Sequence, residues 1–597
     1  MKKTTSITLL FAVTALFALY VGCGQGTPDA AKSSAPKANL MLAQMQSRLP
    51  QDVLQSCTIS QSDFNSWFAT GTASENGIVL PANSVTFGHN NNCDFYKWSW
   101  QMFAWLVSPL SRVESVMTSP VFYTVSPATN NQRTLIPHTP GQALRATSSI
   151  TQFGPHKLPT IRDKQGNLFE VEKPAANVKP MLMMGAKKTM ISMVEMDAAG
   201  KPVFKDQAGK VMANPKTMTT LKGNIVHEFK ASNGKSVFVG ANGVVESEEG
   251  QAGGNNGLIS ANGSVVYYIT MVNDVFAFYL SGAKNGQISG LQFPTTAAQR
   301  DSICAIARAN GVTLPDSNAL AIEIKTSWVE ASTLPDPANY VTINAVIPTY
   351  NKTSTIWVPT GEQTVKLALL GVHVVGSTAG HPEMVWATFE HQQNSPFAAY
   401  QYLNTKNVVD TVPADSNGKW TLSSNPLDPN PNVSHFKASG DTLKADPGFT
   451  VSASNTSLVF PWGSEMGVSP NAEDGSSAAS NSEVISINNS VFGWLVGNDI
   501  RKRYLLIGAS WTSGGAAPNG FSYSSDPSNP KKTGDAIGTS LMANSTMETF
   551  KQNNQTTCFS CHSNGTTGTP SLAPGVLSHV YTDLQPIPNF KVIPGKK

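Results

Sequence analysis

The sequence predicts a mainly β protein with some α-helix, in which a large antiparallel, strand-rich body makes up most of the 597 residues. Two observations support this prediction. Only 14% of the residues are charged, whereas Ser, Thr, Asn, Gly and Pro are abundant, a composition typical of proteins rich in strands and turns. Between residues 160 and 280, runs of β-branched and aromatic residues alternate with Gly-containing turns, which is the pattern of successive hairpins.

Residues 1–22 are predicted to be a signal peptide. Two lysines precede the apolar run ITLLFAVTALFALYVG, which is too short to span a bilayer stably. The stretch LYVGC resembles the lipobox of bacterial lipoproteins, in which the cysteine, here Cys23, is acylated and becomes the first mature residue. Tyr20 stands where leucine is expected, so cleavage by the ordinary signal peptidase is the alternative. Residues 23–45 are small and polar and would form a flexible, lipidated tether, and Gly24 favours the outer membrane.

Residues 46–160 are predicted to form an N-terminal part that contains a helix with an aromatic stripe. In NNNCDFYKWSWQMFAWLVSPL, residues 90–110, large apolar residues recur at steps of three and four, and the Asn-rich start can cap a helix. An aromatic stripe of this kind is usually core, although it could also line a cofactor pocket.

Residues 161–400 are predicted to be the strand-rich body. The expected strands after the hairpin region are 321–328, 340–347, 354–358 and 364–375. The stretch PTTAAQRDSICAIARANG, residues 294–311, predicts a helix, because its apolar residues share one face, Thr295 or Thr296 can cap it and Gly311 can end it.

Residues 401–485 are predicted to be an irregular, loop-rich region, since Ser, Asn, Asp, Pro and Gly dominate them. The final part, residues 486–597, contains a predicted strand at 503–511. Ser545 and Glu548 fit a capping box, Ser-x-x-Glu, which predicts a short helix directly before the motif described next.

The stretch TCFSCHSN contains Cys558, Cys561 and His562 in the spacing Cys-x-x-Cys-His. This is the pattern by which one c-type haem is attached, with thioether bonds to both cysteines and an iron bond from the histidine. Covalent attachment keeps the cofactor from dissociating in a dilute compartment outside the cytoplasm, so the motif agrees with the predicted export. A chance motif, a zinc site or a thiol site is the alternative.

The sequence does not decide which residue binds the other face of the iron. His579 is the first candidate, because it lies 17 residues after His562 and the same segment could wrap the haem. Met542 and Met547 precede the motif, and thioether ligation would raise the reduction potential. His373 and His391 of the body are further candidates, each of which could instead be an ordinary structural histidine. The position could also stay open.

The chain has six cysteines, three of which are neither in the motif nor at the lipobox. In an oxidising compartment we expect Cys57 to pair with Cys93, because both lie in polar, loop-like surroundings, and Cys304 to be buried on a helix. Three unpaired thiols are the alternative.

Only 35 residues follow His562, and none is methionine. This tail is too short to bury a haem by itself, and exposing even a few hundred Å² of porphyrin would cost several kcal/mol at about 25 cal/mol/Å². We therefore expect a short C-terminal c-haem segment docked on the strand-rich body.

Three stretches carry a resemblance to a known group. LALLGVHVVGSTAGHPEMVWATFEHQQNSP (367–396), YLLIGASW (504–511) and the region around the motif from 543 to 586 resemble bacterial proteins labelled cytochrome c family, most of them uncharacterised. These proteins have a single C-terminal Cys-x-x-Cys-His motif behind a long mixed body. The resemblance implies haem binding and electron transfer and names no substrate.

The sequence thus predicts an exported monohaem c-type cytochrome that transfers electrons at the cell envelope of a Gram-negative bacterium, as a periplasmic or outer-membrane-anchored lipoprotein. Its expected partners are redox proteins of the envelope and the membrane, through the lipid; the net charge of +3 gives no basic stripe for nucleic acid. One alternative is a haem-dependent oxidoreductase, peroxidase- or oxygenase-like, with an open iron beside a pocket in the body. The other is an envelope binding protein with an attached haem.

Overall fold

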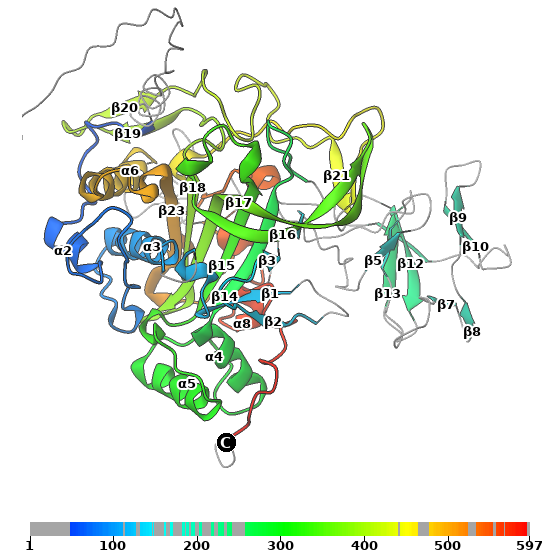
Figure 1. Cartoon of the computed structure of the whole chain (residues 1–597), viewed down its shortest axis with the longest axis horizontal. Helices are drawn as coiled ribbons and strands as arrows, with labels where there is room; N and C mark the ends of the chain where they lie inside the picture. Colours follow the sequence, from blue (N-terminus) through cyan, green and yellow to red (C-terminus); the bar gives the residue numbers. More distant parts are fainter. Residues whose placement is uncertain are drawn as a thin grey trace, which may run out of the picture. The chain divides into compact units, whose positions relative to one another are not determined.

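The structure of the chain is a computed structural model (Figure 1). It describes residues 48–148 and 257–593, apart from gaps at 111–113, 127–131, 146, 440–441, 464–476, 523–532, 553–556 and 566–567, together with the backbone of short strands between 160 and 240. The predicted signal peptide, Cys23 and the tether lie outside the described residues.

One large sheet organises the described residues, with strand order β2-β1-β14-β15-β17-β18-β23-β24 and antiparallel neighbours throughout (Figure 1). These strands are β1 Phe122–Val125, β2 Leu135–Pro137, β14 Tyr267–Asn273, β15 Ile322–Glu330, β17 Ile356–Thr378, β18 His381–His391, β23 Tyr504–Thr512 and β24 Ala536–Gly538. Five more join its margins: β3 Leu144–Arg145, β4 Thr147–Ser148, β16 Thr342–Lys352, β21 Phe436–Ser439 and β22 Thr442–Ala445. The predicted class, mainly β with some α, is confirmed.

β17 is a single strand of 23 residues, where the sequence predicts two separate strands at 354–358 and 364–375. Its first part pairs with β16 and its second part with β15 and β18. The connection at residues 359–363 is exposed to solvent, which explains its polar sequence, yet its backbone still pairs with β16 across a bulge at Thr349 and Tyr350.

Helices α3 (Asn92–Leu106) and α6 (Ser477–Trp494) cover one face of the sheet near β18 and β23, and α2 (Gln61–Ser66) contacts α6 (Figure 1). The predicted aromatic helix is thereby confirmed as α3. Its aromatic stripe is core: Trp98 and Trp100 are at most 2% exposed, and Phe103 stacks on Phe389 of β18 with ring centres 4.3 Å apart. Burial of these large rings stabilises the packing of α3 on this face of the sheet.

Cys57 and Cys93 form a disulfide, the pair that the sequence favours. It joins the segment before α2 to the first turn of α3. The predicted second helix is α5 (Ala297–Ala309), capped by Thr296 in a capping box with Gln299. Cys304 lies on α5 as a free, partly buried thiol. A further helix packed on α5, α4 (Asp274–Lys284), has no counterpart in the prediction, because its apolar run continues directly from β14 without a helical period.

The interpretation of residues 401–485 as irregular is wrong at its end, where α6 begins at Ser477. The stretch is rich in Ser and Asn, which are typical of loops, but in α6 many of these side chains are buried. In the structure they bond to other parts of the backbone: Asn488 exchanges two hydrogen bonds with Leu506 of β23, at 2.9 and 3.0 Å, and the Ser482 hydroxyl accepts from the backbone of Leu403 at 2.7 Å. A helix whose polar residues serve tertiary contacts shows no amphipathic period.

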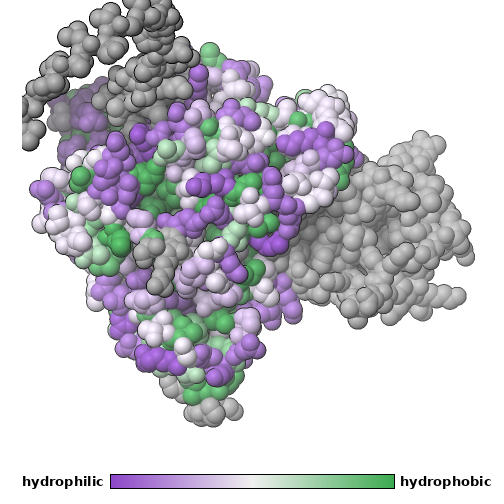
Figure 2. Space-filling model, viewed as in Figure 1, coloured by the Kyte–Doolittle hydropathy of each residue, from purple (hydrophilic) through white to green (hydrophobic). Residues whose placement is uncertain are grey.

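The remaining strands form small sheets of their own. They are β5 Thr160–Arg162 with β6 Leu168–Glu170, β9 Met193–Met196 with β10 Pro202–Lys205, β19 Tyr400–Leu403 with β20 Val409–Val412, and a group of β7 Leu182–Met184, β8 Lys187–Thr189, β11 Lys216–Thr219, β12 Ile225–Ala231 and β13 Ser236–Gly240. No helix within the described ranges has the length and apolar character needed to cross a bilayer. In the view of Figure 2, hydrophobic residues on the described surface lie in small groups among hydrophilic ones.

Candidate functional site

Cys558 and Cys561 occupy a single helical turn, α7 (Cys558–Cys561). Thr557 caps it in a reciprocal pair with Ser560: the Ser560 N–H donates to the Thr557 hydroxyl at 3.0 Å and the Thr557 N–H to the Ser560 hydroxyl at 3.1 Å. The turn places both thiols on one side, because residues three apart face the same way on a helix. Both thiols are free; Cys561 is exposed and Cys558 is partly buried.

Phe559, between the two cysteines, anchors this turn to the body. Its side chain is fully buried in the hydrophobic cluster that includes α4, and its ring lies edge-on to Trp386 of β18 at 5.8 Å. Burial, with a smaller contribution from the charge of Glu548, raises the pKa of the Cys558 thiol. Reactive thiol-redox sites show the opposite shift, so the arrangement disfavours that interpretation of Cys-x-x-Cys.

His562 follows the turn and has one ring nitrogen fixed. Its Nδ1 lies 2.8 Å from the carbonyl oxygen of Leu577, at the end of helix α8 (Pro574–Leu577), so Nδ1 carries the hydrogen and donates it. Burial and the charges of His579, Lys325 and His373 hold the pKa of His562 well below its ordinary value, which keeps the ring neutral. Its Nε2 therefore has a free lone pair, the arrangement in which histidine binds a metal.

His579 lies against His562 in this structure. The two rings stack with centres 4.0 Å apart and planes 14° apart, and His579 Nε2 is 3.1 Å from the carbonyl oxygen of Cys561. Two imidazoles on opposite sides of one metal would have ring centres roughly 6 Å apart, given metal–nitrogen bonds of about 2 Å. Ligation by both rings would therefore require His579 to move.

The motif docks at one end of a polar sheet face, which we define by three cross-strand rows on β15, β17 and β18. The rows are Ser327, Gly371 and Glu390; Lys325, His373 and Thr388; and Glu323, Val375 and Trp386. Side chains alternate along a strand, so these residues share a face, opposite the one that α3 covers. Trp386 is 7% exposed and its ring centre is 4.3 Å from that of His562.

Residues 539–549, the covering segment, follow β24 and bond to this polar sheet face through Asn544, Ser545, Thr546 and Glu548. The Asn544 amide donates to the Thr388 hydroxyl at 2.9 Å, and the Ser545 N–H donates to the Glu390 carboxylate at 2.6 Å. Gly371 permits the close approach, since a Cβ there would lie 2.7 Å from the Asn544 amide nitrogen. The covering segment thereby satisfies polar groups that would otherwise be buried alone.

His373 of the polar sheet face pairs with Glu548 of the covering segment. His373 Nε2 lies 2.9 Å from Glu548 Oε1, its Nδ1 lies 3.0 Å from the Thr388 hydroxyl, and the two paired side chains are 20% and 28% exposed. Burial alone would raise the pKa of Glu548, but the neighbouring His373 and Lys325 outweigh burial and lower it.

The predicted helix after Ser545 is wrong. Among the described residues between Ser545 and the motif, which end at Gln552, the helical element is a 3₁₀ turn, Thr549–Lys551. The two residues of the expected capping box are used elsewhere, because the Ser545 hydroxyl bonds to Glu390 at 2.5 Å and Glu548 bonds to His373. Tertiary hydrogen bonds have replaced the local cap.

The other candidates for an iron ligand are differently placed. Met542 and Met547 are at most 6% exposed and belong to hydrophobic clusters. His391 has both ring nitrogens engaged, by the Asn339 carbonyl at 3.1 Å and the Gln393 N–H at 3.3 Å, and burial lowers its pKa to about 3. His391 is thus a structural histidine in this structure.

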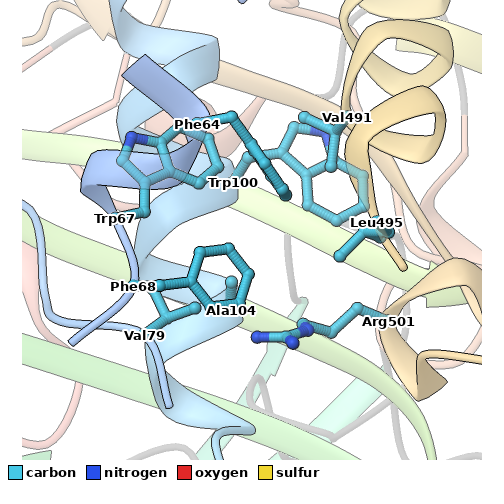
Figure 3. Close-up of a pocket in the computed structure, with 9 residues that line it drawn as sticks. All are labelled: Phe64, Trp67, Phe68, Val79, Trp100, Ala104, Val491, Leu495 and Arg501. Carbon is cyan, nitrogen blue, oxygen red and sulfur yellow. The ribbon is translucent and has the colours of Figure 1, made fainter. Parts of the chain in front are cut away.

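A separate space under α2, α3 and α6 is lined by Phe64, Trp67, Phe68, Val79, Trp100, Ala104, Val491, Leu495 and Arg501 (Figure 3). It amounts to about 210 Å³ including open solvent, and none of it admits a water molecule. This space is a gap between packed side chains of the core and offers no room for a cofactor.

The residues around the motif fit a covalently attached haem by their chemistry. Two free thiols share one helical turn, a neutral histidine has its Nδ1 held by a carbonyl, and Trp386 and Phe559 supply apolar contact. Within the described part of the chain, no three His, Cys, Asp or Glu side chains are grouped to hold a metal ion by themselves. Comparisons with protein-family models, curated proteins and solved structures found no match.

The sequence identifies the motif but not the residues that contact it from other parts of the chain. Trp386, Leu577 and the His373–Glu548 pair had no local signal, because His373 and Glu548 are 175 residues apart and Leu577 contributes only a backbone oxygen.

Proposed function

We propose that this protein is an exported, monohaem c-type cytochrome that transfers electrons at the bacterial cell envelope. The observation that supports it most is the combination of Cys558, Cys561 and His562 on one helical turn with the 2.8 Å contact from His562 Nδ1 to the Leu577 carbonyl. A metal-bound histidine in proteins ordinarily donates its other ring N–H in this way.

In this proposal each residue has a defined role. Cys558 and Cys561 hold the haem by thioether bonds, and His562 offers Nε2 to the iron while Leu577 fixes the orientation of its ring. Trp386 and Phe559 keep water from that side of the site. The haem supplies one-electron chemistry, and the chain supplies its burial and orientation.

The test is covalent haem staining after denaturing electrophoresis, on protein produced in cells that carry a c-type haem maturation system. The wild type should stain, and the double variant Cys558→Ala/Cys561→Ala should not. Cys304→Ala removes the other free cysteine of the described residues, lies outside the motif and should stain as the wild type does. An unstained wild type, or a stained double variant, would contradict the proposal.

A haem oxidoreductase is the second candidate, favoured by one observation. His373 and Glu548 form a polar, partly exposed pair close enough to the motif to influence the pKa of His562 and of Cys558. Such a pair could serve acid–base chemistry beside an open iron.

Spectroscopy separates the two functions and tests His579. A low-spin ferric spectrum that ignores cyanide, and that becomes high-spin in His579→Ala, indicates a carrier with two histidine ligands. A high-spin spectrum that shifts with cyanide, unchanged in His579→Ala, indicates an open site and the oxidoreductase.

The proposal also places the protein at the cell envelope, held by a lipid on Cys23, which residues 1–45 of the sequence support. Acylation of Cys23 should make the protein partition with membranes, and Cys23→Ser should release it to the soluble periplasmic fraction. Retention of Cys23→Ser in the membrane would argue against a lipid anchor.

A further inference from the structure

The hairpin between β17 and β18 carries a buried histidine–carboxylate pair outside the motif. His381 Nδ1 lies 2.8 Å from Glu383 Oε1, and the side chains are 2% and 0% exposed. The Thr512 N–H also donates to this oxygen at 3.1 Å. The carboxylate thus fixes the ring of His381 with the hydrogen on Nδ1.

The other polar side-chain atoms of this pair have no hydrogen-bond partner among the described residues. His381 Nε2 and Glu383 Oε2 are both buried without a hydrogen bond, and the hydroxyls of Ser377 and Thr378 on the same hairpin are also unpartnered. Buried polar groups are nearly always bonded, so unpartnered polar atoms on one hairpin indicate an absent ligand or water.

His89 stands beside His381 at the surface. The two rings lie edge to face, with centres 4.6 Å apart, and Phe95 packs perpendicular to His381 on another side at 5.0 Å. His89 Nδ1 is 3.3 Å from the carbonyl oxygen of Phe87. The Cε1–Nε2 edge of His89 faces the hairpin, since a Cβ at Gly380 would lie 3.5 and 3.7 Å from these atoms.

We infer that His89 and His381 bind one divalent late-transition-metal ion, Cu²⁺ or Zn²⁺, through their Nε2 atoms. Each Nδ1 faces a carboxylate or a carbonyl oxygen, the outer contact that metal-bound histidines ordinarily make. Two imidazoles on one ion with metal–nitrogen bonds of about 2.1 Å, at angles between 90° and 110°, have ring centres roughly 4.5–5.3 Å apart. The observed 4.6 Å falls in that range.

The ligand class follows from the donor atoms. Imidazole nitrogen suits Cu²⁺ and Zn²⁺ and is a poor ligand for Mg²⁺ or Ca²⁺. With two protein ligands, water completes the coordination, so the ion stays open to exogenous ligands. The site does not depend on haem attachment at Cys558 and Cys561.

The test is titration of the full haem-loaded protein, purified without a histidine tag and treated with a chelator, with CuSO₄ and separately with ZnCl₂. Calorimetry should give one ion per chain. Electron paramagnetic resonance of the Cu²⁺ form should show two nitrogen ligands. His89→Ala, a change at an exposed side chain, should weaken binding at least tenfold and leave one nitrogen ligand.

The matched control is His435→Ala, since His435 is also exposed, stacks on an aromatic ring, that of Phe449, and lies outside the hairpin. It should bind metal as the wild type does. A wild type that takes up no ion, or equal binding by the wild type and His89→Ala, would overturn the inference and leave water as the partner of His381. The haem spectrum, recorded in parallel, reports on the motif separately.

Discussion

Glu390 shows how a single buried carboxylate can fix a segment that is distant in the sequence. It is 2% exposed, accepts hydrogen bonds from the Ser545 N–H and the Asn394 amide, and bonds the Ser545 hydroxyl. Burial raises the pKa of Glu390, although these bonds oppose the rise. Its donors come from the covering segment and from the turn after β18, so this one residue joins three parts of the site.

Glu390→Gln should destabilise the protein. The amide has a single oxygen, so it cannot accept from both the Ser545 N–H and the Asn394 amide, which donate to different oxygens of Glu390. A buried unsatisfied donor costs about 1–3 kcal/mol. The measurement is the urea midpoint of the purified full-length protein. Glu362→Gln is the control, because Glu362 forms an exposed ion pair with Arg145 and its loss should hardly move the midpoint. Equal shifts in both variants would contradict the role of Glu390.

Asp274 gives the stability of the protein a pH dependence. Burial raises its pKa to about 8 from an ordinary value of 3.8, so the folded chain keeps the proton where the unfolded chain has lost it. The folded state then binds more protons, and the free energy of unfolding falls as pH rises between about 4 and 8, by up to about 1.4 kcal/mol per pH unit.

Asp274→Asn should flatten this slope, since the amide does not titrate. The measurement is urea unfolding at several pH values between about 5 and 8, compared with the wild type. A residual slope at the acidic end is expected from Glu323, whose pKa burial raises to about 7. Parallel slopes in wild type and variant would show that Asp274 is ionised in the folded protein.

At the scale of elements, two glycines in the sheet strands allow the covering segment to pack closely against the sheet. A Cβ at Gly508 of β23 would collide with the side chain of Thr539, and one at Gly371 of β17 would meet Asn544. Side chains at these two positions would push the covering segment away from the sheet, and with it the turn that carries Cys558. The fold of the strands and the geometry of the site are therefore coupled.

Gly508→Ala should destabilise the protein by about 1–3 kcal/mol, as overpacking does. Gly493→Ala is the matched control: Gly493 lies in α6 with nothing near its Cβ position, so alanine there should be neutral or stabilising by up to about 1 kcal/mol. Thermal unfolding of the two variants checks this. A Gly508→Ala protein as stable as Gly493→Ala would show that the covering segment shifts to accommodate the methyl group without loss of stability.

The sequence predicts those elements whose signals are local. α3 and α5 show helical periods, α5 has a capping box, β15 begins with alternating apolar and polar residues, β23 is a largely apolar run, and the motif is five contiguous residues. The predictions for α6 and for the region of Ser545 are wrong because the polar side chains there bond to other parts of the chain, as Asn488 does to the Leu506 backbone and Ser545 to the Glu390 carboxylate. Contacts between residues far apart along the chain leave no pattern in a single sequence, which is why Trp386 and Leu577 could not be foreseen.

At the scale of the whole molecule, the C-terminal residues complete the body. The covering segment, α7 and α8 pack on strands β15, β17 and β18, and Leu584 forms a bridge with Arg133 near β2. The segment that carries the Cys-x-x-Cys-His motif is thus an integral layer of the fold.

A chain ending at Gly538 should fail to fold cooperatively, because it leaves Glu390 and the rest of the polar sheet face without their partners. Near-ultraviolet circular dichroism and thermal unfolding measure this. Full-length Cys558→Ala/Cys561→Ala is the control, since it lacks the two cysteines of the motif and keeps the covering segment. A truncated protein with a sharp transition at the wild-type temperature would contradict the prediction.

The position of the polar sheet face in the chain has a consequence for biosynthesis. Its strands, Ile322 to His391, are made about 150 residues before the covering segment at 539–549. During synthesis from the N-terminus, this face therefore stays uncovered until residues 539–549 have been made. Under the proposed function, thioether attachment of haem at Cys558 and Cys561 would compete in time with packing of the covering segment on the sheet. Slow attachment would then yield folded protein without haem.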